Sequence, residues 1–310
     1  MRIVAALGGN ALLRRGEPLT AETQRRNVRA AAAALAPLIL DGHQVIITHG
    51  NGPQVGLIAL QSAAGPADGF YPLDILDAES EGMIGYLIEQ ELRNALPTHH
   101  LLATLLTQIR VDPRDPAFLK PTKPIGPVYR ESEAKRFAGE RGWSVGPDGN
   151  GWRRVVPSPA PLEILEVRVI ELLVARGVTV ICAGGGGIPV AQRADGSLVG
   201  VEAVIDKDHA SALLARMIGA DRLLLLTDVD AVYRGWGTGN AQPIASVHPD
   251  ALDPAEFTEG SMRPKVEAAI AFANESGRAA SIGRLDDVGE IIKGEAGTTI
   301  SRSTISPPRK

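Results

Sequence analysis

Three lysines of this chain occur in settings that suit an anionic ligand. Lys207 lies between two acids, in the run Asp206-Lys207-Asp208, where an apolar stretch gives way to a helical pattern. Lys265 falls in the first turn of another expected helix, where a positive charge opposes the helix dipole and a bound anion would offset that cost. Lys123 stands in a proline-rich segment that limits its backbone freedom. Taken singly, each lysine fits solvation at the surface as well as ligand binding, and Asp206-Lys207-Asp208 also fits a structural ion-pair cluster.

Three glycine turns follow predicted β-strands. Gly8-Gly9-Asn10 ends the apolar run 3–7, Gly50-Asn51-Gly52 follows the β-branched run 44–48, and four glycines at 184–187 end the run 178–183. Parallel strands bring their carboxyl ends to one edge of a sheet, which is where open α/β sheets bind ligands. Glycine lets backbone N–H groups approach an anion closely. The three turns together therefore predict an anion site at that edge.

Two common phosphate-binding signatures do not match. The chain has no G-x-x-x-x-G-K-[ST] sequence, which excludes a P-loop. Gly50, Gly52 and Gly56 have a spacing one residue longer than the dinucleotide fingerprint. Phosphate binding in this chain would therefore use a different scheme.

Strand and helix patterns alternate along the chain and predict an α/β fold with a mainly parallel sheet. The expected helices span 20–40 (bent or broken near Pro37), 73–96, 162–176 (with Pro161 at its start) and 261–276. Further strands are expected at 101–111, 222–226, 279–282 and 298–301. Residues 112–161 differ in character, being rich in proline and glycine, and predict an inserted lid or subdomain with short strands around 145 and 153–156.

Composition excludes several classes of function. A net charge of −4 argues against general nucleic-acid binding and against a polybasic membrane surface. No apolar stretch approaches the roughly 20 residues of a membrane-spanning helix. Cys182 is the only cysteine, so no disulfide can form within the chain, and a reducing compartment such as the cytoplasm is expected. The histidines lack metal-site spacing, so any metal is expected to arrive as Mg²⁺ on a nucleotide.

Nine motifs, in order over nearly the whole chain, resemble those of the carbamate kinases, a branch of the amino-acid kinase superfamily. They are VAALGGNAL (4–12), THGNGPQVG (48–56), EGMIGYLIE (81–89), DPAFLKPTKPIGPVY (115–129), RRVVPSPAP (153–161), CAGGGGIPV (182–190), GVEAVIDKDHA (200–210), LTDVD (226–230) and GSMRPKVEAAI (260–270). The motif around Lys123 separates this branch from acetylglutamate, aspartate and uridylate kinases.

The resemblance implies a single domain over residues 1–310, built as a three-layer αβα sandwich around a mainly parallel sheet, with a lid at about 112–161. It implies a homodimer, and the reversible reaction of ATP with carbamate to give ADP and carbamoyl phosphate, commonly run toward ATP in arginine fermentation by the deiminase route.

The resemblance also assigns residues to roles. Gly8, Gly9, Asn10, Gly50, Asn51 and Gly52 would hold carbamate and the transferring phosphoryl group in the N-terminal half. Lys123, Lys207 and Lys265 would contact phosphate, and Asp208 would orient the lysines. The nucleotide site in the C-terminal half would comprise Asp206, Lys207, Thr227, Asp228, Tyr233, Met262 and Lys265.

Two departures from the family pattern bear on this assignment of roles. Arg263 replaces the usual glycine before Pro264-Lys265, where it would add a phosphate contact, point to solvent or crowd the site. Ser281–Leu285 also differs, on the nucleotide side. The rival functions are another carboxylate kinase of the same superfamily and a non-catalytic nucleotide or anion sensor on the same fold.

Overall fold

A computed structural model describes residues 1–13, 16–64, 71–258 and 260–303. Its main sheet has eight strands in the order β15-β17-β16-β12-β1-β2-β9-β3, and every pair is parallel except β16 and β17. These strands span β1 Arg2–Leu7, β2 Gln44–His49, β3 Leu102–Thr104, β9 Thr179–Ile181, β12 Arg222–Thr227, β15 Ser246–Val247, β16 Ala279–Arg284 and β17 Thr298–Ile300. The prediction of a mainly parallel sheet is confirmed.

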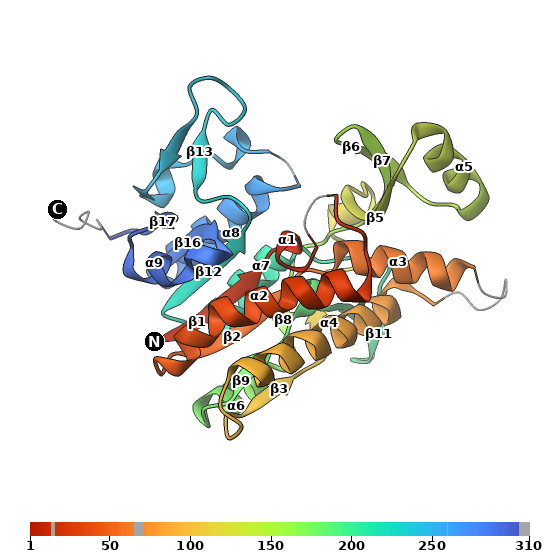
Figure 1. Ribbon diagram of the computed structural model, residues 1–310. Helices are drawn as coiled ribbons and strands as arrows, with labels where there is room; N and C mark the ends of the chain where they lie inside the picture. The colour runs from red at the N-terminus through yellow and green to blue at the C-terminus, as the bar shows by residue number, and fades with distance from the viewer. Residues whose placement is uncertain (14–15, 65–70, 259, 304–310) are drawn as a thin grey trace.

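Helices cover both faces of this sheet, giving three layers (Figure 1). Both faces must be covered because both are apolar. Along β1, Ile3 and Ala5 pack on one face and Val4 and Ala6 on the other, all with no exposed area. One core is completed by α2 Ala21–Leu40, α4 Leu73–Ala95 and α9 Val288–Lys293, and the other by α6 Val167–Ala175, α7 Lys207–Met217 and α8 Met262–Ser276.

Smaller sheets and helices complete the structure. A three-stranded antiparallel sheet, β5-β7-β6, is formed by β5 Lys123–Tyr129, β6 Val145–Asp148 and β7 Gly151–Val156, and α5 Glu131–Arg141 packs on it. This unit and the β13–β14 hairpin project on either side of α1 (Figure 1). The remaining elements are α1 Gly9–Leu12, α3 Gly52–Ala63, β4 Gln108–Arg110, β8 Glu163–Ile164, β10 Ile188–Gln192, β11 Leu198–Gly200, β13 Val232–Arg234 and β14 Gln242–Ile244.

Four predictions of local structure were wrong or incomplete. The expected strand 101–111 is two strands, since β3 joins the main sheet and β4 pairs with β8 and β10 in another. The expected helix 162–176 begins only at Val167, because pairing with Ile109 in β4 buries Ile164 in a strand. Pro37 does not break α2. Proline has no N–H to donate to the carbonyl of Ala33, one turn earlier, but both residues are exposed, so water can bond that carbonyl. Helix α5 was not predicted.

Candidate active site

The carboxyl ends of four adjacent strands bring the predicted turns together. In the order β12-β1-β2, Leu226, Leu7 and His49 lie side by side in register, and β9 follows β2. Gly8 follows β1, and its N–H donates to Leu226 O at 2.9 Å. A Cβ on Gly8 would lie 2.8 Å from that oxygen, so only glycine fits this approach. The first turn therefore lies directly against the end of β12.

The second turn lies beside Lys207. A Cβ on Gly50 would be 3.5 Å from Lys207 Cδ and 3.6 Å from Gly9 N, so Gly50, Gly9 and the lysine stem are neighbours. Gly52 begins α3, and a Cβ there would meet open space, as it would at Gly9. Asn10 belongs to α1, but its side chain falls outside the described residues. Two of the three predicted turns thus border one lysine.

The third turn, residues 184–187, is buried and packs behind the second. A Cβ on Gly185 would lie 2.1 Å from Asn51 Nδ2, and one on Gly186 would lie 2.3 Å from Ile205 O. Gly185, Gly186 and Gly187 all have positive φ, which explains the glycine run. This turn supports the residues around Asn51 and Asp206, and its glycines serve close packing of backbone.

Asp206 caps the helix that presents Lys207 and Asp208. Its Oδ1 accepts from the N–H groups of Asp208 (2.9 Å) and His209 (3.3 Å), as an N-cap aspartate does. Its Oδ2 accepts from Lys123 Nζ, which arrives from β5. The attraction of Lys123 outweighs the burial that would otherwise raise the pKa of Asp206, and holds that pKa well below its ordinary value. Asp206 is therefore an anion joining α7 to β5.

Asp208 holds the other two lysines. Lys207 Nζ donates to its Oδ1 at 2.5 Å and Lys265 Nζ to its Oδ2 at 2.9 Å. Burial would raise the pKa of Asp208, but the two lysines lower it. Burial lowers the pKa of Lys207, helped by the positive charge of Lys265. For Lys265, attraction by Asp208, Asp206 and Asp228 outweighs burial and raises the pKa.

These five side chains form one cluster with three ammonium groups and two carboxylates, a net charge of +1, in which Asp206, Lys207 and Asp208 are buried and Lys123 and Lys265 are partly exposed. Lys207 is 9% exposed and Asp208 is 3% exposed, so water screens their charges weakly. The lowered pKa of Lys207 has a direct consequence: an anion binding nearby would stabilise its charged form. The cluster beside the two glycine turns therefore has the charge and the N–H donors that could accept an anion.

Thr48 and Ser211 fix the start of α7 against the end of β2. Ser211 Oγ donates to Lys207 O at 2.6 Å and lies 2.6 Å from Thr48 Oγ1. Both side chains are fully buried. Sequence reasoning missed this pair, although Thr48 begins the motif that contains the second turn and Ser211 directly follows the motif 200–210.

Comparisons with known proteins agree with this geometry. The amino acid kinase family model matches residues 1–284. The carbamate kinase of Rhizobium meliloti (strain 1021) is 55% identical over 305 residues, covering 98% of this chain and 94% of that protein. The structure of the Giardia lamblia carbamate kinase bound to citric acid is 41% identical, with a TM-score of 0.91 over 97% of this chain and 98% of that one. The same protein bound to AMP-PNP is 40% identical, with a TM-score of 0.87 over the same shares of the two chains.

The chain belongs to the amino acid kinase family, in its carbamate kinase branch. The fold class predicted from the sequence is confirmed, and the rival assignment to another branch is not favoured.

The nucleotide-side residues expected of a carbamate kinase are only partly drawn together. Thr227 ends β12, and its Oγ1 donates to Asp228 Oδ1 at 3.1 Å. The charge of Asp228 helps raise the pKa of Lys265, so Asp228 lies near the cluster. Tyr233 instead bonds Asp230, with its hydroxyl 3.0 Å from Oδ2. Met262 begins α8 and packs against the core.

The two departures from the carbamate kinase pattern lie outside the lysine cluster. Arg263 donates from Nε to Phe257 O at 3.2 Å and from Nη2 to Ala255 O at 3.4 Å, so it ties the preceding loop to α8. Residues 281–283 are buried in β16, where Ser281 lies 3.3 Å from Thr299. Arg284, opposite Thr227 at the strand end, is the exposed part of that segment.

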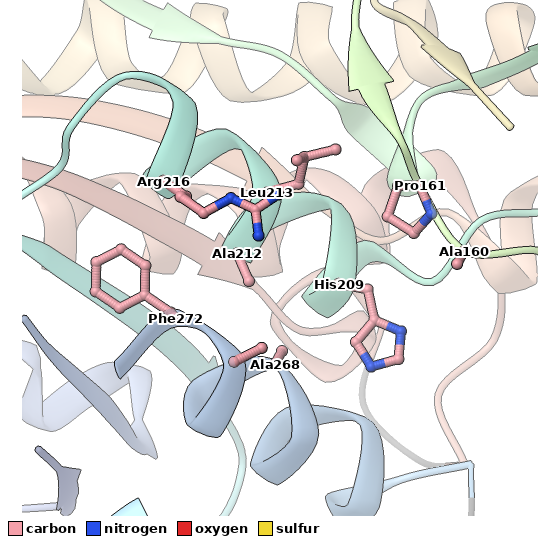
Figure 2. A pocket seen from close by; sticks show the side chains of 9 residues that line it. Ala160, Pro161, His209, Ala212, Leu213, Arg216, Ala268 and Phe272 are labelled. Carbon is pink, nitrogen blue, oxygen red and sulfur yellow. The ribbon is translucent and has the colours of Figure 1, made fainter. Parts of the chain in front are cut away.

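A separate pocket of about 160 Å³ lies between α7, α8 and residues 160–161 (Figure 2). Its two ionisable side chains have partners, since His209 Nε2 lies 3.4 Å from Glu267 Oε2 and Arg216 bonds Glu275. None of the three lysines lines it. Elsewhere in the described part of the chain, no group of three or more His, Cys, Asp or Glu side chains is arranged to hold a metal. No helix within the described ranges is long and apolar enough to cross a membrane.

Proposed function

We propose that this chain catalyses the reversible transfer of a phosphoryl group between ATP and carbamate, giving ADP and carbamoyl phosphate. The observation that supports this most strongly is the meeting of Lys123, Lys207 and Lys265 around two carboxylates, beside two glycine turns. A relative with 55% identity over almost the whole chain is named carbamate kinase, and on this basis carbamate is proposed as the phosphoryl acceptor.

Catalysis in this proposal is positioning plus stabilisation of charge. Phosphoryl transfer needs little covalent help from a protein, and carbamate is already an anionic nucleophile, so no general base is required. The turns at Gly8-Gly9 and 50–52 hold carbamate and the transferring group with backbone N–H donors. Lys207 and Lys265 contact phosphate oxygens, and Asp208 keeps both ammonium groups in place. In a site this buried, fixed donors stabilise developing charge strongly.

The three-stranded sheet and α5, within residues 112–161, serve as a lid in this proposal. Lys123 is its first strand residue and reaches Asp206, at the edge of the anion site. Carbamate and carbamoyl phosphate are both labile in water, so a lid that excludes water protects the substrates during transfer.

The carboxylates of the cluster fit a Mg²⁺ ion that is held by the nucleotide. Both oxygens of Asp208 accept from lysines, and Asp206 accepts from Lys123 and two N–H groups. Such satisfied carboxylates suit an ion bound by phosphate oxygens and water, as Mg²⁺ commonly is. When bound there, the ion would neutralise phosphate charge.

The physiological setting is proposed from the family resemblance. The enzyme would make ATP from carbamoyl phosphate at the end of arginine catabolism by the deiminase route. A single, fully buried cysteine fits a reducing compartment, and we place the enzyme in the cytoplasm.

A homodimer is also part of the proposal, and α4 with the edge strand β3 offers a surface for it. Tyr86 and Leu106 are each 53% exposed and Leu101 is 57% exposed, while β3 ends the main sheet. Apolar exposure beside an open strand edge suits an interface between copies. Light scattering should give the mass of two chains, and Leu106→Glu should reduce it to one. A wild-type chain that is monomeric at micromolar concentration contradicts the proposal.

The activity test is ATP formation from ADP, Mg²⁺ and carbamoyl phosphate. Lys207→Ala and Lys123→Ala should each lower kcat by about 10²–10³, as loss of one preorganised donor commonly does. Lys293→Ala, a change of an exposed lysine in α9, is the matched control and should leave kcat unchanged. No ATP above background from the wild-type chain refutes the function, and near-normal turnover by Lys207→Ala refutes its role.

Two rival functions give different results in the same experiment. Another carboxylate kinase of the family would phosphorylate acetylglutamate or a similar acid in a substrate panel and leave carbamate untouched. A sensor would bind nucleotide with no turnover of any acceptor. Retention of all three lysines with Asp208 disfavours the sensor, because binding alone does not need the full set.

A further inference from the structure

Three polar side chains of α4 lie buried beneath the glycine turns. Ser80 and Glu81 follow Asp77 by three and four residues, so the three side chains lie on one face of the helix. Their exposed fractions are 1%, 0% and 1%. Buried polar groups of this kind persist where they make specific hydrogen bonds. Asp77 and Ser80 both bond Asn51, and Glu81 bonds Gly184.

The side-chain amide of Asn51 is held by two of them. Its Nδ2 donates to Asp77 Oδ1 and to Ser80 Oγ, both at 2.9 Å. Ser80 Oγ in turn donates to Asp77 O at 2.9 Å, so the serine has a fixed orientation. On its other side the amide is covered by Gly185, where a Cβ would lie 2.1 Å from Nδ2. Both N–H groups of the Asn51 amide therefore point into the protein, away from a ligand.

Asp77 accepts from Asn51 through one carboxyl oxygen only, Oδ1. Its Oδ2 is buried and, among the described residues, has no hydrogen-bond partner. Burial raises the pKa of Asp77 well above its ordinary value, opposed by the bond from Asn51 and assisted by Glu81, Asp74 and Glu202. A carboxyl that accepts through one oxygen can be replaced by a carboxamide of the same shape, whose oxygen accepts the same bond. Asp77→Asn is therefore the conservative variant at this position.

Glu81 holds the third turn. Its Oε1 accepts from Gly184 N at 2.7 Å and its Oε2 from Thr107 N at 3.1 Å. Thr107 Oγ1 accepts from Ala183 N at 2.9 Å. Ala183 has a φ of 49°, a left-handed conformation that is unfavourable for alanine and that these bonds help to maintain. The turn that covers the Asn51 amide is thus itself anchored to α4.

We propose that Asp77, Ser80 and Glu81 are positioning residues for phosphoryl transfer, acting from α4 through Asn51 and the 183–187 turn to aim the backbone N–H groups of residues 50–52. Asn51 in this arrangement sets the shape of the turn, and the ligand meets the backbone. The inference rests on the proposed function, which assigns residues 50–52 to carbamate and the transferring group. By resemblance Asn51 would hold carbamate and the transferring phosphoryl group, and the inference assigns that contact to its backbone and not to its side-chain amide.

The test compares Asp77→Ala, Asp77→Asn and Ser80→Ala with wild type in ATP formation from ADP and carbamoyl phosphate. Asp77→Ala should lower kcat by roughly 10–100-fold, because a small misplacement of the reacting groups has such an effect, and leave the KM for ADP within about twofold. Asp77→Asn should stay within about threefold of wild type, and Ser80→Ala should lose roughly tenfold. Glu79→Gln, on the exposed side of α4, is the control and should match wild type.

A second readout separates this inference from the proposed function. Backbone hydrogen exchange of the Gly50 N–H, which donates to Leu7 O, should be faster than in wild type in Asp77→Ala and Ser80→Ala and unchanged in Asp77→Asn, whether or not the enzyme turns over the substrates tested. An inactive wild type with this exchange pattern overturns the function and supports the positioning. An active wild type whose Asp77→Ala variant keeps both kcat and the wild-type exchange rate overturns the positioning. Equal damage in Asp77→Asn and Asp77→Ala also overturns it, and Ser80→Ala decides if Asp77→Ala does not fold.

Discussion

Gly56→Ala should disable the enzyme without touching any residue of the lysine cluster. Gly56 lies in α3, where its backbone meets Gly126 of β5. A Cβ at Gly56 would lie 1.8 Å from Gly126 Cα, 2.1 Å from Gly126 N and 3.1 Å from Ile125 C. Carbon atoms in good contact are about 3.5–4.0 Å apart, so the backbones must separate by about 2 Å. No side chain can rotate away, because all three nearest atoms are backbone.

The displacement falls on the strand that holds Lys123. Gly126 has a φ of +74° and adjoins an irregularity in the pairing of β5 with β7, so this part of the strand already has a special conformation. Lys123 begins the same strand and bonds Asp206. A shift of 1 Å or more in a group that contacts the reacting phosphate commonly costs about 10²-fold in rate. We expect kcat to fall by ~10², with a loss of ~1–3 kcal/mol in the free energy of unfolding from overpacking.

The assay is ATP formation from ADP and carbamoyl phosphate, together with thermal unfolding followed by circular dichroism. Gly139→Ala is the matched control, since Gly139 lies within α5 of the same subdomain and a Cβ there meets nothing within 4 Å. That variant should keep its kcat and gain about 0.5–1 kcal/mol from helix propensity. A folded Gly56→Ala enzyme with kcat within twofold of wild type would falsify the reasoning.

Three further outcomes are expected. Asp208→Asn removes the negative charge that Lys207 and Lys265 share. We expect kcat to fall at least 10²-fold in steady-state kinetics and the free energy of unfolding to fall by ~3 kcal/mol in urea. Burial lowers the pKa of His49 to about 4, compared with 6.5 in the unfolded chain. The contribution of the neutral, buried imidazole to the free energy of unfolding is therefore complete above pH 6.5, and it is lost as the pH falls from 6.5 toward 4. Relative to His49→Gln, wild type should lose ~3 kcal/mol of unfolding free energy over that range; a constant difference between the two contradicts the assignment. Burial raises the pKa of the Cys182 thiol, so iodoacetamide at pH 8 should label the protein only in denaturant, and rapid labelling of native enzyme would show that the site opens.

Local chemistry made much of this protein predictable. Glycine after an apolar run marks the end of a strand, and charges before an Ala/Leu-rich segment mark the entry to a helix, so the sequence placed the turns at 8–9 and 50–52 and the region where α7 begins. Parallel strands share one edge for their carboxyl ends, so the meeting of those turns also followed from the sequence. The motifs added the branch of the family, because nine of them occur in order over nearly the whole chain.

Tertiary structure decided which charges meet and which polar groups are buried. Lys123 and Asp206 are 83 residues apart and Lys265 and Asp208 are 57 apart, so no local pattern shows that they pair. The burial of Asn51 against α4 depends on a helix that begins more than 20 residues later. The split of residues 101–111 between two sheets is likewise set by the partner strands on each side. Sequence singled out the three lysines as candidate phosphate contacts, but long-range packing brought them to two carboxylates and turned the Asn51 amide inward.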